Sequence, residues 1–181
     1  VLTNTTAEIK TIKGYMKNNY SMSNYKSAFG GAIANGGNAK IDTIEGNFIN
    51  NYAKSEYGSA RSGAIYNVSS SIIGSIEGIF SDNYALTNNS YAQGGAIYNA
   101  SNIDDIKSST FSNNFVSGAS EQTDGGAIWN NGTIGFSGVN VFQNNYKIVN
   151  GEKTANDIYN SGTINVAENG SITLNGGVTG N

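Results

Sequence analysis

The amino-acid sequence predicts an all-β protein, a right-handed parallel β-helix of about 5 to 6 coils with about 31 residues in each coil. Three observations lead to this fold. Two short motifs alternate along the 181 residues with one period, and short segments rich in β-branched residues lie between them. Gly or Asn also interrupts every stretch in which a helix would need a continuous apolar stripe, which argues against helices.

The first motif is Phe-x-x-Asn followed by an aromatic residue. Its copies run from Phe48 to Asn51, Phe80 to Asn83, Phe111 to Asn114 and Phe142 to Asn145, with Met16 to Asn19 as a degenerate first copy. From Met16 onward the copies are 32, 32, 31 and 31 residues apart. A nearly constant step of this length is typical of solenoid proteins.

The second motif is Gly-Gly-Ala-Ile, usually followed by an aromatic residue and Asn. Clear copies run from Gly30 to Ile33, Gly94 to Ile97 and Gly125 to Ile128, and variants end at Ile65 and Ile158. The Gly pairs are expected where the chain re-enters a strand with backbone angles that a Cβ would obstruct. Two independent motifs that keep one period indicate stacked structural units.

Each unit is expected to contain three short strands and one variable polar loop. Strands are predicted at the Ala-Ile-aromatic-Asn segment, at an isoleucine-rich segment and at the Phe-x-x-Asn motif, because these are bounded by Gly, Asn and Ser. The loops are expected at residues 54–62, 86–93, 117–124 and 148–154. Stacking would pair equivalent strands in parallel about 4.8 Å apart. We therefore expect one β-helix domain over residues 1–181, with a degenerate first coil or N-terminal cap at 1–20, repeat coils at 21–164 and a C-terminal coil or cap at 165–181.

Stacking of equal units places like residues above one another in ladders. The predicted ladders are Phe48, Phe80, Phe111 and Phe142; Asn51, Asn83, Asn114 and Asn145; and Ile33, Ile65, Ile97 and Ile128. Phe and Ile are expected in the interior, where burial of each side chain stabilises the fold by about 1.5 to 3 kcal/mol. The Asn ladder is expected at a corner, because Asn tolerates left-handed backbone angles and its amide can bond along the stack.

Composition excludes several classes of function. The chain has no Cys and no His, so it offers no disulfide, zinc, haem, thiol or imidazole chemistry. Ten basic against 13 acidic residues give a net charge of -3 without a basic stripe, so nucleic acid is not expected as a partner. No run approaches the roughly 18 apolar residues of a membrane-spanning helix. We predict no cofactor, no metal and no insertion of this segment into a membrane.

The carboxylates are not arranged as a catalytic centre in the predicted register. Asp42 and Asp104 fall in one column but two coils apart, with Gly74 between them. Polysaccharide-active β-helices need acids that converge within a few ångströms. The protein is therefore expected not to be an enzyme, and a β-helical polysaccharide-active enzyme is kept as a distant alternative. Most loop acids are expected to be solvated charges.

The outward-facing aromatic residues are candidates for a partner-binding face. They form two columns, and either they pack beneath the loops or they bind sugar rings or a partner surface. Together with acids of the loops, the candidate partner-binding residues are Trp129, Tyr98, Tyr66, Tyr91, Glu121 and Asp124.

The alternation of the two tetrapeptides resembles the passenger region of chlamydial polymorphic outer-membrane proteins and related bacterial autotransporter adhesins. The resemblance covers residues from about 12 to 160 and rests on Gly94 to Ile97, Gly125 to Ile128, Gly30 to Ile33 and the Phe/Asn pairs. One departure is the fifth Gly-Gly-Ala-Ile copy, which reads Ala-Asn-Asp-Ile.

This resemblance implies a secreted right-handed β-helix displayed on the bacterial cell surface, with a role in adhesion and no catalytic residues to transfer. The expected partner is a host or bacterial cell-surface protein or glycan. The alternative is a structural subunit that self-assembles end to end into a surface fibre, because a β-helix exposes strand edges at its ends.

Overall fold

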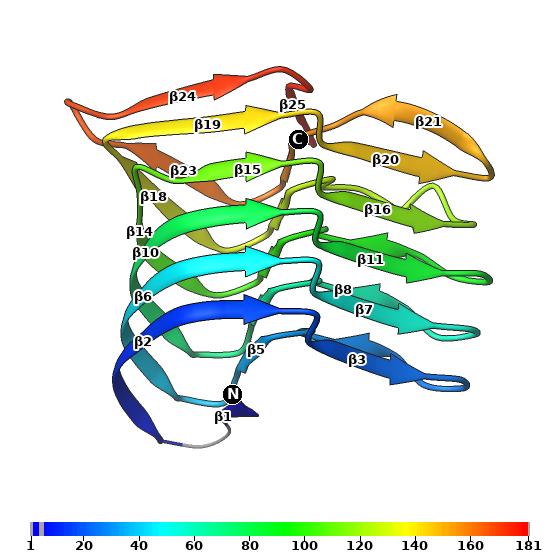
Figure 1. Cartoon of the computed structure of the whole chain (residues 1–181), viewed down its shortest axis with the longest axis horizontal. Helices are drawn as coiled ribbons and strands as arrows, with labels where there is room; N and C mark the ends of the chain where they lie inside the picture. Colours follow the sequence, from blue (N-terminus) through cyan, green and yellow to red (C-terminus); the bar gives the residue numbers. More distant parts are fainter. Residues whose placement is uncertain (1, 4–5, 181) are drawn as a thin grey trace.

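The computed structural model describes residues 2–3 and 6–180, with side chains described from residue 6 onward. Within these residues the chain forms strands and no helix. The strands wind into a parallel β-helix of about five turns with a repeat of about 32 residues (Figure 1). The all-β parallel β-helix is thus confirmed. The predicted domain limits at residues 1 and 181 lie outside the described residues.

Sheet A collects the strands of the Gly-Gly-Ala-Ile motif. Its strands, in order, are β1 (Leu2–Thr3), β5 (Ile33–Asn35), β9 (Ile65–Asn67), β13 (Ile97–Asn99), β17 (Ile128–Asn130), β22 (Ile158–Asn160) and β25 (Val178–Thr179). Each pair is parallel, and from β5 to β22 isoleucine lies opposite isoleucine. The predicted Ile column is therefore one edge of the core.

Sheet B contains the isoleucine-rich and Phe-x-x-Asn segments. In the first coils these are not two strands, as expected, but one strand of 10 residues in each coil, β2 (Glu8–Lys17), β6 (Lys40–Ile49) and β10 (Ile72–Ser81). Later coils divide into two strands: β14 (Asn102–Lys107) and β15 (Thr110–Ser112), then β18 (Thr133–Ser137) and β19 (Val139–Gln143), then β23 (Thr163–Val166) and β24 (Ser171–Leu174).

An inserted residue explains this division. Three residues separate Ile76 from Phe80, whereas four separate Ile106 from Phe111, although both pairs are in register. The chain accommodates the extra length at Ser108, which takes a left-handed φ of 47°, and Gly138 takes a φ of 62° in the next coil. A residue in this conformation cannot continue an extended strand.

The expected variable loops are instead ordered hairpin-like projections, here called the wing. The outgoing strands form sheet C and are β3 (Tyr20–Ser23), β7 (Tyr52–Ser55), β11 (Tyr84–Thr87), β16 (Phe115–Gly118) and β20 (Tyr146–Val149), with β21 (Glu152–Ala155) antiparallel to β20. The returning strands form sheet D and are β4 (Ala28–Phe29), β8 (Ala60–Arg61) and β12 (Ala92–Gln93). The wing projects to the right of the coil stack in Figure 1.

The wing has a small core of its own. Its buried side chains are Ala28, Ala53, Ala60, Ala85, Ala92 and Val116. Small side chains let sheets C and D approach closely, which accounts for so thin a projection remaining ordered. Only the short turns between outgoing and returning strands, such as residues 88–90 and 119–122, are loops in the expected sense.

Stacked side chains fill the main core. The rings of Phe48, Phe80, Phe111 and Phe142 are fully buried and stack face to face, with centroids 4.7, 4.8 and 4.5 Å apart along the column. Met16 and Leu174 lie in register with the two ends of this column. The interior is therefore a continuous apolar column along the helix.

Two ladders of buried Asn line the corners of the coil. In the ladder of the Phe-x-x-Asn motif, each Nδ2 donates to the Oδ1 of the next coil, from Asn51 to Asn83 at 2.9 Å and from Asn83 to Asn114 at 3.0 Å. Each Nδ2 also donates to a backbone carbonyl, as Asn83 does to Phe48 at 2.8 Å. The left-handed φ lies one residue earlier than expected, at residues such as Asn50 and Asn113. The second ladder runs from Asn35 to Asn160 in sheet A.

Candidate ligand groove

An aromatic column covers the outer face of sheet A, where the wing approaches it. Tyr66, Tyr98, Trp129 and Tyr159 stack in that order, with ring centroids 5.1, 4.4 and 5.6 Å apart. The ring of Phe29, from the wing strand β4, stacks on Tyr66 with the centroids 4.9 Å apart. Because a two-residue period alternates the faces of a strand, these rings point outward while the neighbouring isoleucines point into the core.

A second column of side chains faces the aromatic column from the returning strands of the wing. It consists of Phe29, Arg61, Gln93 and Asp124, which lie in register with one another. Each of these residues directly precedes the first position of the Gly-Gly-Ala-Ile motif. The motif thus places two columns opposite each other, one aromatic and one mixed.

Arg61 joins the two columns in the early coils. Its guanidinium lies 5.7 Å from the centroid of Phe29, 5.4 Å from that of Tyr91 and 5.2 Å from that of Tyr98. Its Nε donates to Gln93 Oε1 at 3.2 Å, and its Nη2 donates to the Tyr91 hydroxyl at 2.7 Å. These contacts fill this part of the space between wing and sheet A with a cation–π cluster.

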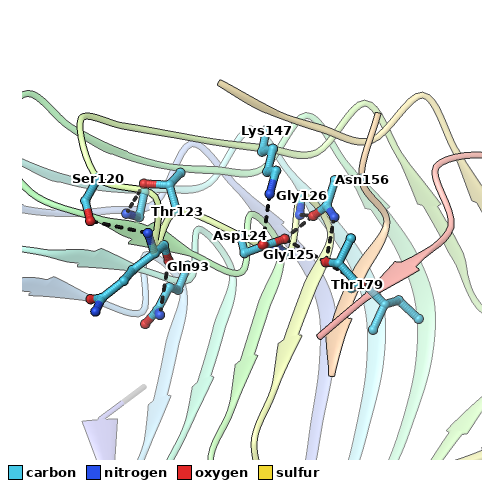
Figure 2. A network of polar contacts seen from close by, with 12 residues as sticks. Gln93, Ser120, Thr123, Asp124, Gly125, Gly126, Lys147, Asn156 and Thr179 are labelled. Carbon is cyan, nitrogen blue, oxygen red and sulfur yellow. Dashed lines mark hydrogen bonds and ion pairs between the residues drawn. The ribbon is translucent and has the colours of Figure 1, made fainter. Parts of the chain in front are cut away.

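Asp124 holds the end of the second column, and it is not the solvated loop charge that we expected. The residue is only 9% exposed. Its carboxylate accepts hydrogen bonds from Lys147 Nζ at 2.9 Å, from the Thr179 hydroxyl at 2.9 Å and from the Gly125 backbone amide at 3.0 Å (Figure 2). This network ties β20 and β25 to the segment that precedes β17, so Asp124 has a structural role.

Between the two columns, in the later coils, the surface is hollowed into a groove of about 400 Å³. The groove is lined by Gln93, Glu121, Gln122, Asp124, Trp129 and Tyr159. Its volume is within the range of small-molecule sites. Glu121 and Gln122 come from the turn of the wing, whereas the two rings come from sheet A.

Hydrogen bonds hold the turn that carries Glu121 and Gln122. Within the turn, Thr123 N donates to Ser120 O at 2.9 Å, and Gln122 N donates to Ser120 Oγ at 3.3 Å. Ala92 N donates to Thr123 Oγ1 at 3.2 Å, which anchors the turn to the neighbouring coil (Figure 2). The groove wall is therefore preorganised.

The structure brings together three of the six candidate partner-binding residues. Trp129, Glu121 and Asp124 line the groove. Tyr98 lies beneath Trp129 and is only 6% exposed, so it supports the groove without forming its surface. Tyr66 and Tyr91 belong to the Arg61 cluster in the earlier coils.

Sequence reasoning did not select Gln93, Gln122 or Tyr159 as binding residues. Tyr159 could have been found because it has the position in the last motif copy that Trp129 has in the copy before it. Gln93 could have been found because it precedes the motif in the same way as Arg61 and Asp124. Gln122 has no periodic signal. Its position depends on how the wing folds back.

The acids on the outer face of sheet B lie apart from the groove. Asp42 is paired with Lys40 at 2.7 Å and Lys10 at 3.0 Å, and these ammonium groups lower the pKa of Asp42. Gly74 separates Asp42 from Asp104 in the observed register, as predicted. No group of three or more Asp or Glu that could hold a metal ion occurs in the part of the chain that the structure describes.

No helix among the described residues is long and apolar enough to cross a membrane. No family model matches this chain, and no curated protein or solved structure matches it. The fold and the groove define the class of the protein, a parallel β-helix repeat protein with an ordered lateral wing.

Proposed function

We propose that this chain is a passenger segment of a bacterial adhesin, secreted or exposed on the cell surface, that binds a host or bacterial cell-surface protein or glycan without catalysis. The observation that carries the proposal is the groove, because it combines Trp129, Glu121 and a preorganised turn of the wing on one side of a rigid scaffold. Concave, partly apolar sites with a few polar groups are the usual form of ligand sites.

The repeat motifs and the turns of the wing have different roles, and this difference supports the same proposal. The motif residues are engaged in the core, in the Asn ladders or in close backbone packing. The turns of the wing differ in sequence from coil to coil, as between residues 56–59, 88–90 and 119–122. Variable segments on a rigid scaffold are where binding residues usually occur.

The chemistry of the groove favours binding over acid/base catalysis. Asp124 already accepts hydrogen bonds from three donors, so Glu121 is the groove carboxylate that can bind a ligand. A pair of convergent acids would be needed for glycoside hydrolysis.

The test measures binding of the labelled protein to epithelial cells and to bacterial cells. In one variant, residues 88–90 and 119–122 are replaced by Gly and Ser. These short exchanges spare Ala92, Thr123 and Asp124, which hold the wing together. A control variant, Lys13→Ser with Glu45→Ser, removes an exposed ion pair of 2.6 Å on sheet B.

The proposal predicts saturable binding that the wing variant loses and the control variant keeps, with circular dichroism unchanged in both. Absence of saturable binding by the wild-type protein, or equal binding by all three proteins, would contradict it.

A subunit that assembles end to end is the second candidate. Among the described strands, β2 pairs only with β6 and β3 only with β7, so this end of the molecule presents open strand edges. At the other end, β21 is the edge strand of sheet C and lies antiparallel to β20, and Lys153 Nζ lies 3.5 Å from the centroid of Tyr146. An assembly that used sheet C would therefore have to pair with β21 and not with a parallel strand of the repeat. Sedimentation that depends on protein concentration would favour this candidate.

A further inference from the structure

We infer that the groove between Trp129 and Glu121 binds a neutral or amino sugar and discriminates against acidic sugars. The inference rests on the proposed adhesive function and names a ligand class for it. Three features of the groove carry it: its terminal ring, its set of unused polar groups and its charge.

Tyr159 is the last ring of the aromatic column. The residue that follows it in register is Thr179, which has no ring. Both faces of Trp129 are covered, by Tyr98 at 4.4 Å and by Tyr159 at 5.6 Å. Within the described residues, the face of Tyr159 turned away from Trp129 stacks on no aromatic ring. The rings of Tyr159 and Trp129 both line the groove, where their exposed parts can contact the C–H face of a sugar ring.

The polar groups of the groove suit a ligand that both donates and accepts. In the part of the chain that the structure describes, no hydrogen bond or ion pair occupies the side chains of Glu121, Gln122, Trp129 or Tyr159. Together they offer a carboxylate acceptor, an amide, an indole N–H donor and a phenol. The hydroxyl groups of a sugar can use donors and acceptors at once. The ammonium groups of a basic peptide could use only the acceptors.

The charge of the groove sets the discrimination. Lys147 neutralises Asp124 at 2.9 Å, so the carboxylate of Glu121 remains as the net charge facing the ligand. A sugar carboxylate in the groove would meet this like charge at short range, which is unfavourable. An amino sugar would gain from the same charge.

The test is a binding titration of the full chain with lactose and N,N′-diacetylchitobiose as neutral probes. 3′-Sialyllactose serves as the acidic counterpart of lactose, and a lysine-rich peptide serves as the basic probe. We expect at least one neutral probe to bind, and 3′-sialyllactose to bind more weakly than lactose. Tyr159→Ala is expected to weaken neutral binding by about tenfold or more, equivalent to about 1.4 kcal/mol.

Matched variants separate the groove from the stability of the stack. Tyr66→Ala removes a ring from the same column outside the groove, and Glu56→Gln removes an acid from the turn of another wing hairpin. Neither is expected to change sugar affinity. Glu121→Gln is expected to narrow the difference between lactose and 3′-sialyllactose.

The inference is overturned if no neutral probe binds, if the lysine-rich peptide binds in their place, or if Tyr159→Ala and Tyr66→Ala have equal effects on affinity. If no sugar binds while cell binding still depends on the wing turns, the sugar specificity is contradicted and the adhesive function is not. If sugars bind but the protein does not bind cells, the adhesive function is contradicted and the sugar specificity of the groove is not.

Discussion

The side-chain amide of Asn145 donates to the carboxylate of Asp157 at 2.8 Å, so the buried Asn ladder ends on an acidic residue. In the last copy of the Gly-Gly-Ala-Ile motif, Asp157 has the position that Ala127 has in the preceding copy. Its other oxygen accepts from the Gly176 backbone amide at 2.5 Å. One side chain therefore terminates the ladder and fixes the C-terminal segment.

Removal of this acceptor should destabilise the C-terminal coils. Asp157→Ala would leave donors of Asn145 and Gly176 without their partner in a buried position, which we expect to cost about 2 to 3 kcal/mol. Asp157→Asn keeps one oxygen and should cost about half as much. Urea unfolding followed by circular dichroism measures both, and equal midpoints for wild type and Asp157→Ala would refute this role.

The interior Phe column should be most sensitive at its centre. Phe111 is fully buried between Phe80 and Phe142, so Phe111→Ala should lower the free energy of unfolding by about 3 to 5 kcal/mol. Leu174, partly buried at the end of the column, provides the matched control, and Leu174→Ala should cost less than about 2 kcal/mol. Similar losses at the two positions in urea titrations would contradict a continuous packed column.

The two positions of the Gly pair should differ in their tolerance of a side chain. Gly94 has a φ of 66°, and the equivalent residue Ser62 has a φ of 62° and donates from Oγ to Ala96 O at 2.8 Å. A Cβ at Gly94 would meet the carbonyl oxygen of Ile97 in the same coil, but the coil of Ser62 accommodates a side chain at this position, so Gly94→Ser should cost about 1 to 2 kcal/mol.

Gly95→Ser should be far more damaging. A Cβ at Gly95 would meet Gly126 O and would lie 2.7 Å from both N and O of Phe115. Because these are backbone atoms of the next coil and of the wing, we expect a loss above about 4 kcal/mol or failure to fold. Soluble yield and thermal melting of the two variants test this, and equal behaviour would rule out the steric explanation.

Tyr98 should make stability fall at high pH. Burial beneath Trp129 raises the pKa of Tyr98 from 10.0 to about 12. Since the folded pKa lies above the unfolded value, the stabilisation is fully present below pH 10 and is lost as pH rises from about 10 to about 12, by about 2 kcal/mol. Unfolding measured over this range should show a smaller loss for Tyr98→Phe. An equal pH dependence in the variant would show that other groups cause it.

Much of the fold could be predicted because each motif residue meets its own equivalent in the next coil. The Phe48 and Ile33 columns and the Asn51 ladder all lie where a constant period places them. The period does not describe the local change at Ser108, where one extra residue divides a strand.

The wing was harder to predict. Its core consists almost entirely of alanine, and columns such as Ala53 and Ala85 carry a weak hydrophobic signal within polar segments. The pattern of these segments therefore predicts loops and a solvated Asp124. Alanine is buried there because two thin sheets pack closely, a property of the pair of sheets and not of either strand.

By itself the sequence determined the class of fold and its ladders, because parallel stacking turns a one-dimensional period into contacts between identical residues. Only the tertiary structure decided that Glu121 and Gln122 lie across a groove from Trp129 and Tyr159. This placement of the two pairs of residues depends on the direction in which the wing folds back toward sheet A. The direction is set by the close packing of the wing and by the Asp124 network, which couple residues from different coils.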